Sequence, residues 1–277
     1  MARHRAILER VSPAATLLEA FEPLRSTPGR SAILLDVDGT LAPIVRHAAD
    51  AHVPEATRTL LIAVARRYGL VACISGRRAA NARQIVSIGS IAYIGNHGGE
   101  LLRPGATEVE LDPDVAAWTR RINDFVADAW ETDWERLRVR RENKLAITAF
   151  HWRGAPDEDA AQAAVSTLAA RAEEAGLSVH WGRKVLEVRP PVAIDKGKGV
   201  VSLLRVGESD AALYVGDDTT DLDAFRGLRG LVDEGRLSEA ICVGVRSDET
   251  PPELEREADL LVEGPMGVRS VLEALLD

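Results

Sequence analysis

The chain has 277 residues, 46% of them hydrophobic, which is enough to bury at least one sizeable core. Its net charge of −9 excludes a broad basic surface, so we expect no nucleic-acid partner. No run reaches the roughly 18 consecutive apolar residues of a membrane span, and the charged N-terminus lacks the apolar segment of a signal peptide. We therefore expect a cytoplasmic protein with no membrane partner.

The first hundred residues alternate short apolar runs with amphipathic segments. A helix is predicted over 12–25, with Ser12 as its N-cap. Buried strands are predicted at 31–36, 70–74 and 91–95, with helices over 54–69 and 77–87. Cys73 and Cys242 both lie in apolar runs, which favours buried thiols over a disulfide or a zinc site. The alternation is typical of a doubly wound parallel sheet.

The pattern changes after about residue 112. Helices are predicted over 113–130 and 155–176, and half-buried strands at 137–143, 144–152, 177–182 and 184–190. This order favours an open-faced antiparallel sheet with helices on one side.

The first pattern then returns to the C-terminus. A helix is predicted over 195–206, a buried strand at 211–218, a helix from 219, two further strands at 240–245 and 258–264, and a closing helix from 264. We therefore predict an α/β core domain of residues 1–112 and 191–277, interrupted by an α+β domain of residues 113–190.

The strongest chemical signal is the segment LLDVDGTLAPI, residues 34–44. Asp36 ends a predicted strand, Asp38 lies two residues further on, Gly39 allows a tight turn, and Thr40 offers a hydroxyl and a backbone N–H. Two carboxylates this close repel each other unless a cation lies between them, which indicates a hard metal ion. One carboxylate can attack phosphorus, and the other can transfer protons. A helix-capping turn is the structural alternative.

Three weaker segments also follow predicted core strands or begin helices. Ser75 and Gly76, in ISGRR, can bind phosphate through a hydroxyl and backbone N–H groups. Lys196, in DKGKG, can neutralise phosphate. Three acidic side chains in VGDDTTDLD are natural oxygen ligands for Mg²⁺, although acidic residues also cap helices. They are Asp217, Asp218 and Asp221.

The four segments together form a complete set for phosphoryl transfer. Ligands of open α/β sheets bind beyond the carboxyl ends of the strands, where these segments are predicted to meet. The set supplies a nucleophile, an acid/base, a hydroxyl, a lysine and metal-binding carboxylates.

DVDGT, SGR, DKG and GDDTTD, in this order, resemble the four motifs of haloacid dehalogenase phosphatases. GNHGGE at 95–100, RENK followed by HWR at 141–153, and GRKVLEVRP at 182–190 are similar to segments of the trehalose-6-phosphate phosphatase family. The resemblance covers about residues 31–265. It implies a Rossmann-like haloacid dehalogenase core with an inserted α+β cap domain, and a magnesium-dependent phosphatase that acts on trehalose 6-phosphate.

The resemblance also implies roles for individual residues. Asp36 would form an aspartyl-phosphate and Asp38 would be the acid/base. Mg²⁺ would be held by Asp36, the Asp38 backbone carbonyl and Asp217, with Asp218 nearby. Ser75 and Lys196 would hold the phosphoryl group.

The inserted domain offers candidate sugar contacts. Residues two or four apart on a strand share a face, so Glu142 should point with Lys144, and Arg183 with Glu187. Carboxylates paired with cations can bind vicinal hydroxyls, although cross-strand ion pairs on a solvated face would give the same pattern. The resemblance makes these four residues disaccharide contacts, and adds a substrate loop. The loop residues are Asn96, His97 and Gly98. His151 and Arg153 are weaker candidates.

Other functions stay open from the sequence. The substrate could be another sugar phosphate, such as sucrose phosphate or a glycosyl phosphoglycerate. A non-catalytic regulatory domain that binds sugar phosphate is a second alternative, against which the retained Asp36, Asp38, Lys196 and Asp217 argue. A receiver-type phosphoacceptor is a third, but the long insert disfavours it. We expect a monomer that acts on a small-molecule substrate.

Overall fold

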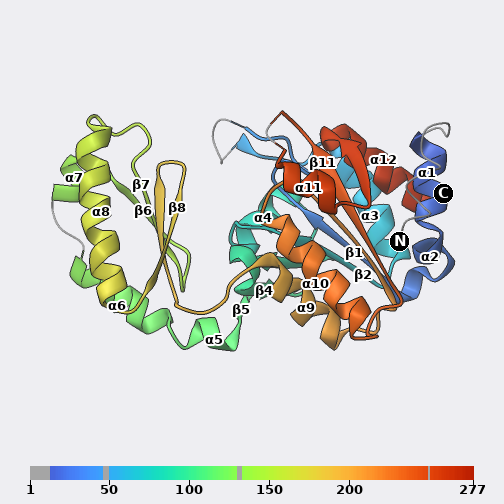
Figure 1. The fold of residues 1–277 in the computed structure, drawn as a ribbon, viewed down its shortest axis with the longest axis horizontal. Coiled ribbons are helices and arrows are strands. Elements are labelled where there is room, and N and C mark those ends of the chain that lie inside the picture. The colour runs from blue at the N-terminus through green and yellow to red at the C-terminus, as the bar shows by residue number, and fades with distance from the viewer. Residues whose placement is uncertain (1–12, 46–49, 130–132, 249) are drawn as a thin grey trace. The chain divides into compact units, whose positions relative to one another are not determined.

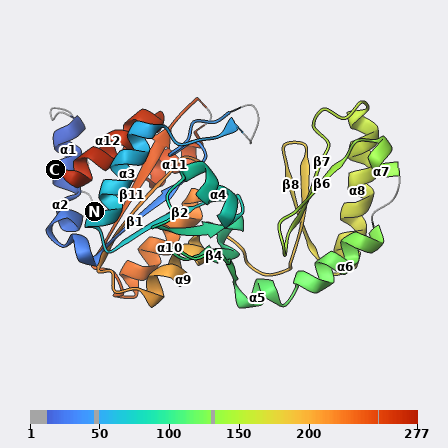
Figure 2. The ribbon, with the colours of Figure 1, turned by 180° about the vertical axis from the view of Figure 1, so that it is seen from behind.

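The computed structural model describes residues 13–45, 50–129, 133–248 and 250–277. The chain divides into two compact units, which Figures 1 and 2 show from opposite sides. The larger unit contains the described residues up to Glu110 together with Ile194–Asp277, and the smaller unit is Leu111–Ala193. The predicted N-cap Ser12 lies outside the described residues.

The larger unit is built on an eight-stranded sheet in the order β12-β11-β10-β1-β2-β3-β4-β5. The strands are β1 Ser31–Asp36, β2 Leu70–Ile74, β3 Ala92–Gly95, β4 Glu100–Leu102, β5 Glu110–Leu111, β10 Ala211–Gly216, β11 Glu239–Arg246 and β12 Leu260–Glu263. The six neighbouring strands from β12 to β3 pair in parallel, and β4 runs antiparallel to β3.

Helices cover both faces of this sheet, as a parallel sheet requires. Along β1, Ile33 and Leu35 enter one apolar core, whereas Ala32 and Leu34 enter the other. The first core also contains residues of α1 Pro13–Ala20, α2 Glu22–Ser26, α3 Glu55–Arg67, α4 Ala79–Val86 and α12 Gly264–Leu276. The second contains residues of α9 Lys196–Val206, α10 Asp221–Asp233 and α11 Pro252–Glu257. The result is a three-layered α/β unit.

The smaller unit has an antiparallel four-stranded sheet in the order β6-β7-β9-β8. Its elements are α5 Pro113–Ala116, α6 Thr119–Ala129, α7 Asp133–Arg136, β6 Arg140–Asn143, β7 Thr148–His151, α8 Glu158–Glu174, β8 Ser178–Gly182 and β9 Val185–Arg189. Phe150, Leu186 and Val188 pack in one buried core with residues of α6 and α8, such as Val126 and Leu168. Helices therefore cover one face of the sheet and leave the other face polar.

Most predicted elements are present, with local differences. The helix predicted over 12–25 is divided at Phe21 into α1 and α2, and the strand predicted at 137–143 begins at Arg140. The helix predicted over 113–130 is divided, because α5 ends at Ala116 and α6 begins at Thr119. The N–H of Trp118 donates to the carbonyl of Val115, three residues back, which tightens the turn between the two helices. The strand predicted at 144–152 is confined to β7, because residues 144–147 form the turn that follows β6.

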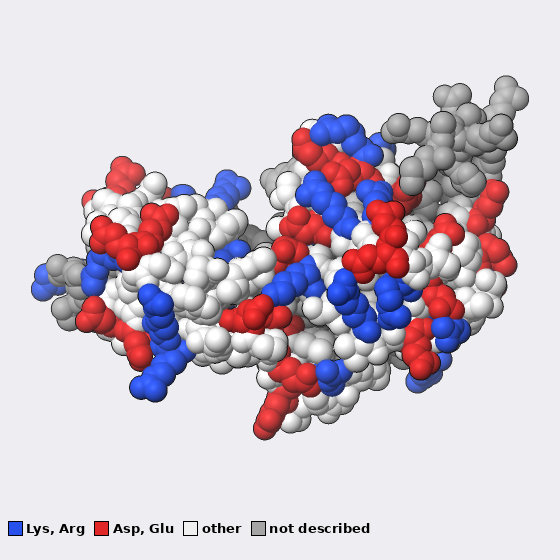
Figure 3. Space-filling model, turned by 60° about the horizontal axis from the view of Figure 1, so that its bottom comes forward, with Lys and Arg blue, Asp and Glu red and all other residues white. Residues whose placement is uncertain are grey.

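On the face shown in Figure 3, acidic and basic side chains are interspersed, so the net negative charge is not gathered there into one patch. Among the described residues, no helix has the length and apolar character to cross a membrane.

Candidate active site

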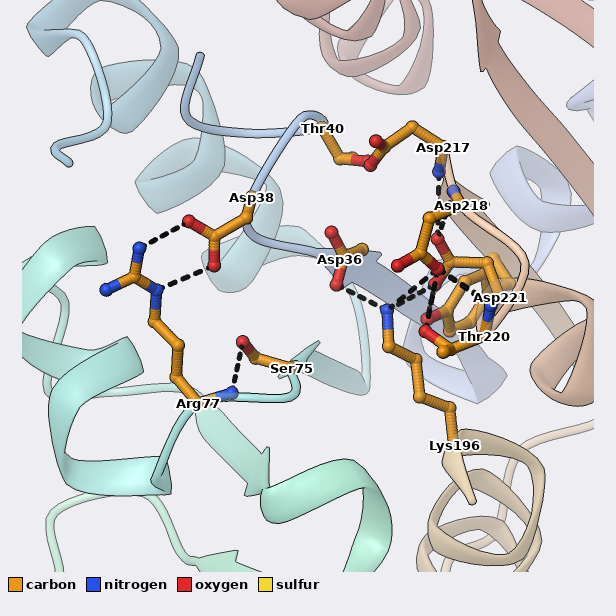
Figure 4. Close-up of polar contacts among 11 residues, drawn as sticks. Asp36, Asp38, Thr40, Ser75, Arg77, Lys196, Asp217, Asp218, Thr220 and Asp221 are labelled. Carbon is orange, nitrogen blue, oxygen red and sulfur yellow. Dashed lines mark hydrogen bonds and ion pairs between the residues drawn. The ribbon is translucent and has the colours of Figure 1, made fainter. Parts of the chain in front are cut away.

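The predicted phosphoryl-transfer residues meet at one edge of the larger sheet (Figure 4). Asp36 is the last residue of β1, and Ser75 directly follows β2. Asp217 directly follows β10, and Lys196 begins α9. Because β1 lies between β2 and β10 in a parallel sheet, the three strand ends are neighbours.

Lys196 is the buried cation of this site. Its Nζ lies 2.7 Å from Oδ1 of Asp36, 2.7 Å from Oδ1 of Asp221 and 3.8 Å from Oδ1 of Asp218. Burial lowers the pKa of Lys196, but the charges of Asp221 and Asp36 outweigh it and raise that pKa above its usual range. The lysine is therefore a fixed positive charge beside the predicted nucleophile.

Asp36 is almost fully buried, with 4% of its surface exposed. Burial raises the pKa of Asp36 well above its ordinary value, Lys196 opposes this, and the charges of Asp221 and Asp217 add to it. The ionised nucleophile therefore depends on nearby positive charge.

Asp221 organises the loop after β10. Its Oδ1 accepts hydrogen bonds from Lys196 and from the hydroxyl of Tyr214, at 2.7 and 2.6 Å. Its Oδ2 accepts from the backbone N–H groups of Asp217 and Asp218, at 2.8 and 3.0 Å. Four donors leave this carboxylate little capacity for another ligand. We infer that Asp221 mainly shapes the loop and supplies charge.

Asp217 has more capacity left for a further ligand than Asp218 or Asp221. The hydroxyl of Thr40 donates to its Oδ1 across 2.8 Å. Burial, together with the charge of Asp221, raises the pKa of Asp217 to about 7, although the Thr40 hydrogen bond opposes the shift. Gly39, at φ +86°, lies directly against it: a Cβ there would be 2.1 Å from Oδ2 of Asp217. The turn after β1 therefore needs glycine at this position.

The donor chemistry fits a hard divalent cation. Asp36, Asp217 and Asp221 are all buried, and one carboxylate oxygen from each lies within 4.8 Å of the others. Buried carboxylates this close need positive charge between them, and oxygen donors suit Mg²⁺. Asp36 and Asp217 are better placed as direct ligands than Asp221, whose oxygens already accept four hydrogen bonds.

Asp218 has a local role in the structure. Its Oδ1 accepts from the N–H and the hydroxyl of Thr220, at 2.8 and 2.7 Å, and from the N–H of Asp221 at 3.2 Å. Burial favours a higher pKa for Asp218, but the charge of Lys196 and the Thr220 hydrogen bond outweigh burial and lower that pKa. Asp218 thus holds the start of α10 and stays ionised.

Asp38, in the loop after β1, pairs with Arg77, in the loop after β2. Nε and an Nη atom of Arg77 donate to the two carboxylate oxygens of Asp38, both at 2.7 Å. The Ser75 hydroxyl accepts from the N–H of Arg77 at 3.1 Å (Figure 4). No role was predicted from the sequence for Arg77, within ISGRR. Its position two residues after the predicted phosphate-binding residue Ser75 is the sequence feature that could have indicated one.

The loop at 96–98 packs closely against its neighbours. The Asn96 side chain is buried and donates to Oε1 of Glu100 at 2.7 Å. The His97 ring lies against Gly76, where a Cβ would be 2.6 Å from the ring. Gly98, at φ +118°, lies against the carbonyl of Asp195. The loop thus supports the segments that carry Ser75 and Lys196, and its predicted substrate contacts stay a prediction.

The predicted sugar contacts of the smaller unit are only partly brought together. Lys144 Nζ lies 2.8 Å from Oε1 of Glu187, whose Oε2 accepts from Nε of Arg189 at 2.9 Å. Glu142 Oε2 lies 3.0 Å from Nε2 of His151. Burial favours a higher pKa for Glu187, but the charges of Lys144 and Arg189 outweigh burial and lower that pKa to about 2. Arg189 was not predicted.

Arg183 differs from its predicted placement. It does not continue the strand of Glu187, because Gly182 pairs with Val185 and residues 183–184 form the turn between β8 and β9. Arg183 is exposed, and its carbonyl accepts from Arg153 at 3.2 Å. The expectation that Arg183 and Glu187 share a strand face is therefore wrong.

Several known proteins are similar in sequence to this chain. The family model described as Trehalose-phosphatase matches residues 34–254. A trehalose-phosphate phosphatase of Mycobacterium avium is 34% identical, over 72% of this chain and 51% of its own length. Trehalose 6-phosphate phosphatase RA3 of Zea mays is 30% identical, over 77% of this chain and 64% of its own. A Mycobacterium tuberculosis protein described as an uncharacterized glycosyl hydrolase is 33% identical, over 79% of this chain but 17% of its own. The chain thus spans less than two thirds of these relatives.

Solved structures share the fold. The C-terminal domain of a Candida albicans trehalose-6-phosphate phosphatase aligns with a TM-score of 0.67 at 21% identity, covering 96% of this chain and 97% of that domain. A haloacid dehalogenase-like hydrolase from Bacteroides thetaiotaomicron aligns at 0.60 and 15%, covering 88% and 98%. The C-terminal domain of a Candida albicans trehalose synthase regulatory protein aligns at 0.62 and 16%, covering 94% and 98%. The predicted haloacid dehalogenase fold is therefore confirmed.

Proposed function

Because the chain belongs to the trehalose-phosphatase family, we propose that it hydrolyses trehalose 6-phosphate to trehalose and phosphate with Mg²⁺ as cofactor. The observation that carries this proposal is the buried Asp36 carboxylate, held 2.7 Å from the ammonium group of Lys196 at the end of β1. A carboxylate with a fixed counter-ion at a strand edge is suited to nucleophilic attack on a phosphoryl group.

The first step transfers the phosphoryl group to the protein. An oxygen of Asp36 forms a bond to phosphorus as the bond from phosphorus to the sugar oxygen breaks. The electron pair of that bond goes to the sugar oxygen, which takes a proton from the Asp38 carboxyl group. The products are free trehalose and an aspartyl-phosphate at Asp36.

The second step returns the protein to its starting state. Asp38, now a carboxylate, accepts a proton from a water molecule whose oxygen attacks phosphorus. The bond from phosphorus to Asp36 breaks, and its electron pair restores the Asp36 carboxylate. Phosphate leaves, and Asp38 again carries the proton that the next cycle requires.

The remaining core residues neutralise and orient the phosphoryl group. Lys196 would contribute its ammonium group, and Ser75, Gly76 and Thr40 would contribute hydroxyl and backbone donors. Mg²⁺, held by Asp36, the Asp38 carbonyl and Asp217, would supply Lewis-acid neutralisation of the phosphoryl oxygens. The three buried carboxylates of Asp36, Asp217 and Asp221 support this choice of cofactor.

We also propose that the smaller unit selects the sugar. Glu142, Lys144 and Glu187 present ionised groups that can bind vicinal hydroxyls by charge-assisted hydrogen bonds. Arg183 is exposed in the turn before β9 and is a further candidate. The loop of Asn96, His97 and Gly98 is proposed to contribute through His97, because it is less deeply buried than Asn96.

One observation favours a second function. The fold is shared with the C-terminal domain of a protein described as a trehalose synthase regulatory protein, so this fold is compatible with a regulatory role. The two functions predict different behaviour of Asp36. A regulatory domain binds sugar phosphate without needing a nucleophile, whereas the phosphatase requires one.

The test is phosphate release from trehalose 6-phosphate, with Mg²⁺ and with EDTA, beside sucrose 6-phosphate, glucose 6-phosphate and glucosyl phosphoglycerate. Selective release that EDTA abolishes is expected. Preferential release from another ester would replace the substrate and keep the chemistry. Binding of trehalose 6-phosphate without release from any ester would favour the regulatory role.

A further inference from the structure

The Arg77–Asp38 pair is not used by the two steps above, although it holds the group that both steps need. The planar guanidinium of Arg77 meets both oxygens of Asp38 at 2.7 Å, the bidentate geometry in which arginine fixes a carboxylate most firmly. The side chains are 23% and 38% exposed, so the pair is partly shielded from water.

Backbone hydrogen bonds brace the two loops that carry these partners. The N–H of Arg77 donates to the Ser75 hydroxyl at 3.1 Å, and its carbonyl accepts from the N–H of Asn96 at 2.7 Å. In the loop that carries Asp38, the N–H of Gly39 donates to the carbonyl of Ala42 at 2.8 Å. The two loops follow the adjacent strands β1 and β2, so the pair joins two braced segments.

The geometry favours one of the two forms that Asp38 must adopt. In the bidentate pair both oxygens of Asp38 act as acceptors, which is the hydrogen-bonding role of a group that accepts a proton from water. When Asp38 acts as an acid, one oxygen carries hydrogen and releases its bond to Arg77. A fixed orientation matters because misplacing a reacting group by about 1 Å can cost on the order of 10²-fold in rate.

We propose that Arg77 is a positioning residue that holds Asp38 ready to accept the proton of the attacking water in the second step. This inference rests on the proposed function, since it assumes the aspartyl-phosphate. It assigns Arg77 to hydrolysis of that intermediate and not to binding of the phosphoryl group, so the two half-reactions should respond differently to its loss.

The experiment uses p-nitrophenyl phosphate with Mg²⁺, because p-nitrophenolate leaves without needing a proton from Asp38. With Arg77→Ala, the first step should stay fast and the second should slow. Rapid mixing should then show a burst of p-nitrophenolate approaching one equivalent per enzyme, followed by turnover about 10²-fold slower than in the wild type. Acid-quenched protein should carry phosphate on Asp36. Free guanidinium at millimolar concentration should restore part of the turnover.

Arg78→Ala is the matched control, since Arg78 lies in the same turn but its Nε is 3.6 Å from Glu100 and it is not bonded to Asp38. It should show no new burst and no rescue by guanidinium. A raised KM with no burst in Arg77→Ala would place Arg77 on the phosphoryl group and overturn the inference. Unchanged turnover would also overturn it. Wild-type protein inactive on every phosphate ester would overturn the proposed function, and the inference with it.

Discussion

The ammonium group of Lys196 lies 2.7 Å from the carboxylate of Asp36, and their side chains are only 2% and 5% exposed. The same ammonium group meets Asp221, which is fully buried, at 2.7 Å. Lys196 thus balances two carboxylates. Among the described residues, no other lysine or arginine pairs with either carboxylate at such a short distance. Removing Lys196 should affect both the fold and the chemistry.

Lys196→Met should lower the free energy of unfolding by about 3–5 kcal/mol, because breaking a buried pair leaves uncompensated charge. It should also abolish turnover. Urea unfolding in EDTA measures the first effect. Lys198→Met is the control on the same helix, and as a partly exposed lysine it should change stability by no more than about 0.5 kcal/mol. Equal effects of the two substitutions would contradict the role given to Lys196.

Gly39→Ala should weaken Mg²⁺ binding. The new Cβ would lie 2.1 Å from Oδ2 of Asp217, and φ at this position is +86°, so both the turn and the carboxylate must shift. We expect at least about a tenfold rise in the Mg²⁺ concentration needed for half-maximal activity, matching about 1.4 kcal/mol of lost binding. Gly29→Ala is the control, because a Cβ added at Gly29 would have no atom within 4 Å. An unchanged Mg²⁺ requirement in Gly39→Ala would argue against Asp217 as a ligand.

The metal-free protein should lose stability as pH rises from about 4 to about 7. Burial raises the pKa of Asp217 from 3.8 to about 7, so the folded state binds more protons than the unfolded state between these values. The contribution of Asp217 to the free energy of unfolding therefore falls across this window and levels off above it. Urea unfolding in EDTA at pH 4.5 to 8 should show a smaller fall for Asp217→Asn. The same pH dependence in both proteins would rule Asp217 out as the cause.

Much of this site was predictable from strand ends. The strands ending at Asp36 and Ile74 have the predicted bounds, because each is a short apolar run buried on both faces. Carboxyl ends of adjacent parallel strands meet, so the gathering of Asp36, Ser75 and Asp217 followed from topology.

Side-chain partners were less predictable. The Arg77–Asp38 pair joins two loops 39 residues apart, and no periodic pattern specifies how loop side chains turn. Arg183 was misplaced because the alternating pattern continues through a two-residue turn, where the positive φ of Lys184 reverses the chain. Asp221 was named with Asp217 and Asp218 as a natural Mg²⁺ ligand because the three follow a predicted strand, but that position does not reveal the four hydrogen-bond donors that the folded loop brings to it.

Glu187→Gln should separate sugar binding from phosphoryl transfer. The carboxylate of Glu187 accepts from both Lys144 and Arg189, and its charge is lost in the amide. If Glu187 binds the sugar, KM for trehalose 6-phosphate should rise about 10–100-fold, as expected for the loss of a charge-assisted hydrogen bond of about 1.5–3 kcal/mol. Turnover of p-nitrophenyl phosphate should stay within about twofold, since this ester lacks a sugar.

Glu158→Gln is the matched control, because Glu158 pairs with Lys184 at the exposed start of α8. It should leave both substrates unaffected. An equal loss of activity on both substrates in Glu187→Gln would show that Glu187 supports the fold and does not select the sugar.

The most direct test of the central claim is whether phosphate becomes covalently attached to Asp36 during turnover. Wild-type protein should be mixed with trehalose 6-phosphate and Mg²⁺, quenched in acid within milliseconds, digested and analysed by mass spectrometry, beside Asp36→Asn. The account predicts one phosphoryl group on the peptide that contains Asp36, and neither that adduct nor phosphate release from Asp36→Asn. Substantial phosphate release by Asp36→Asn would contradict it.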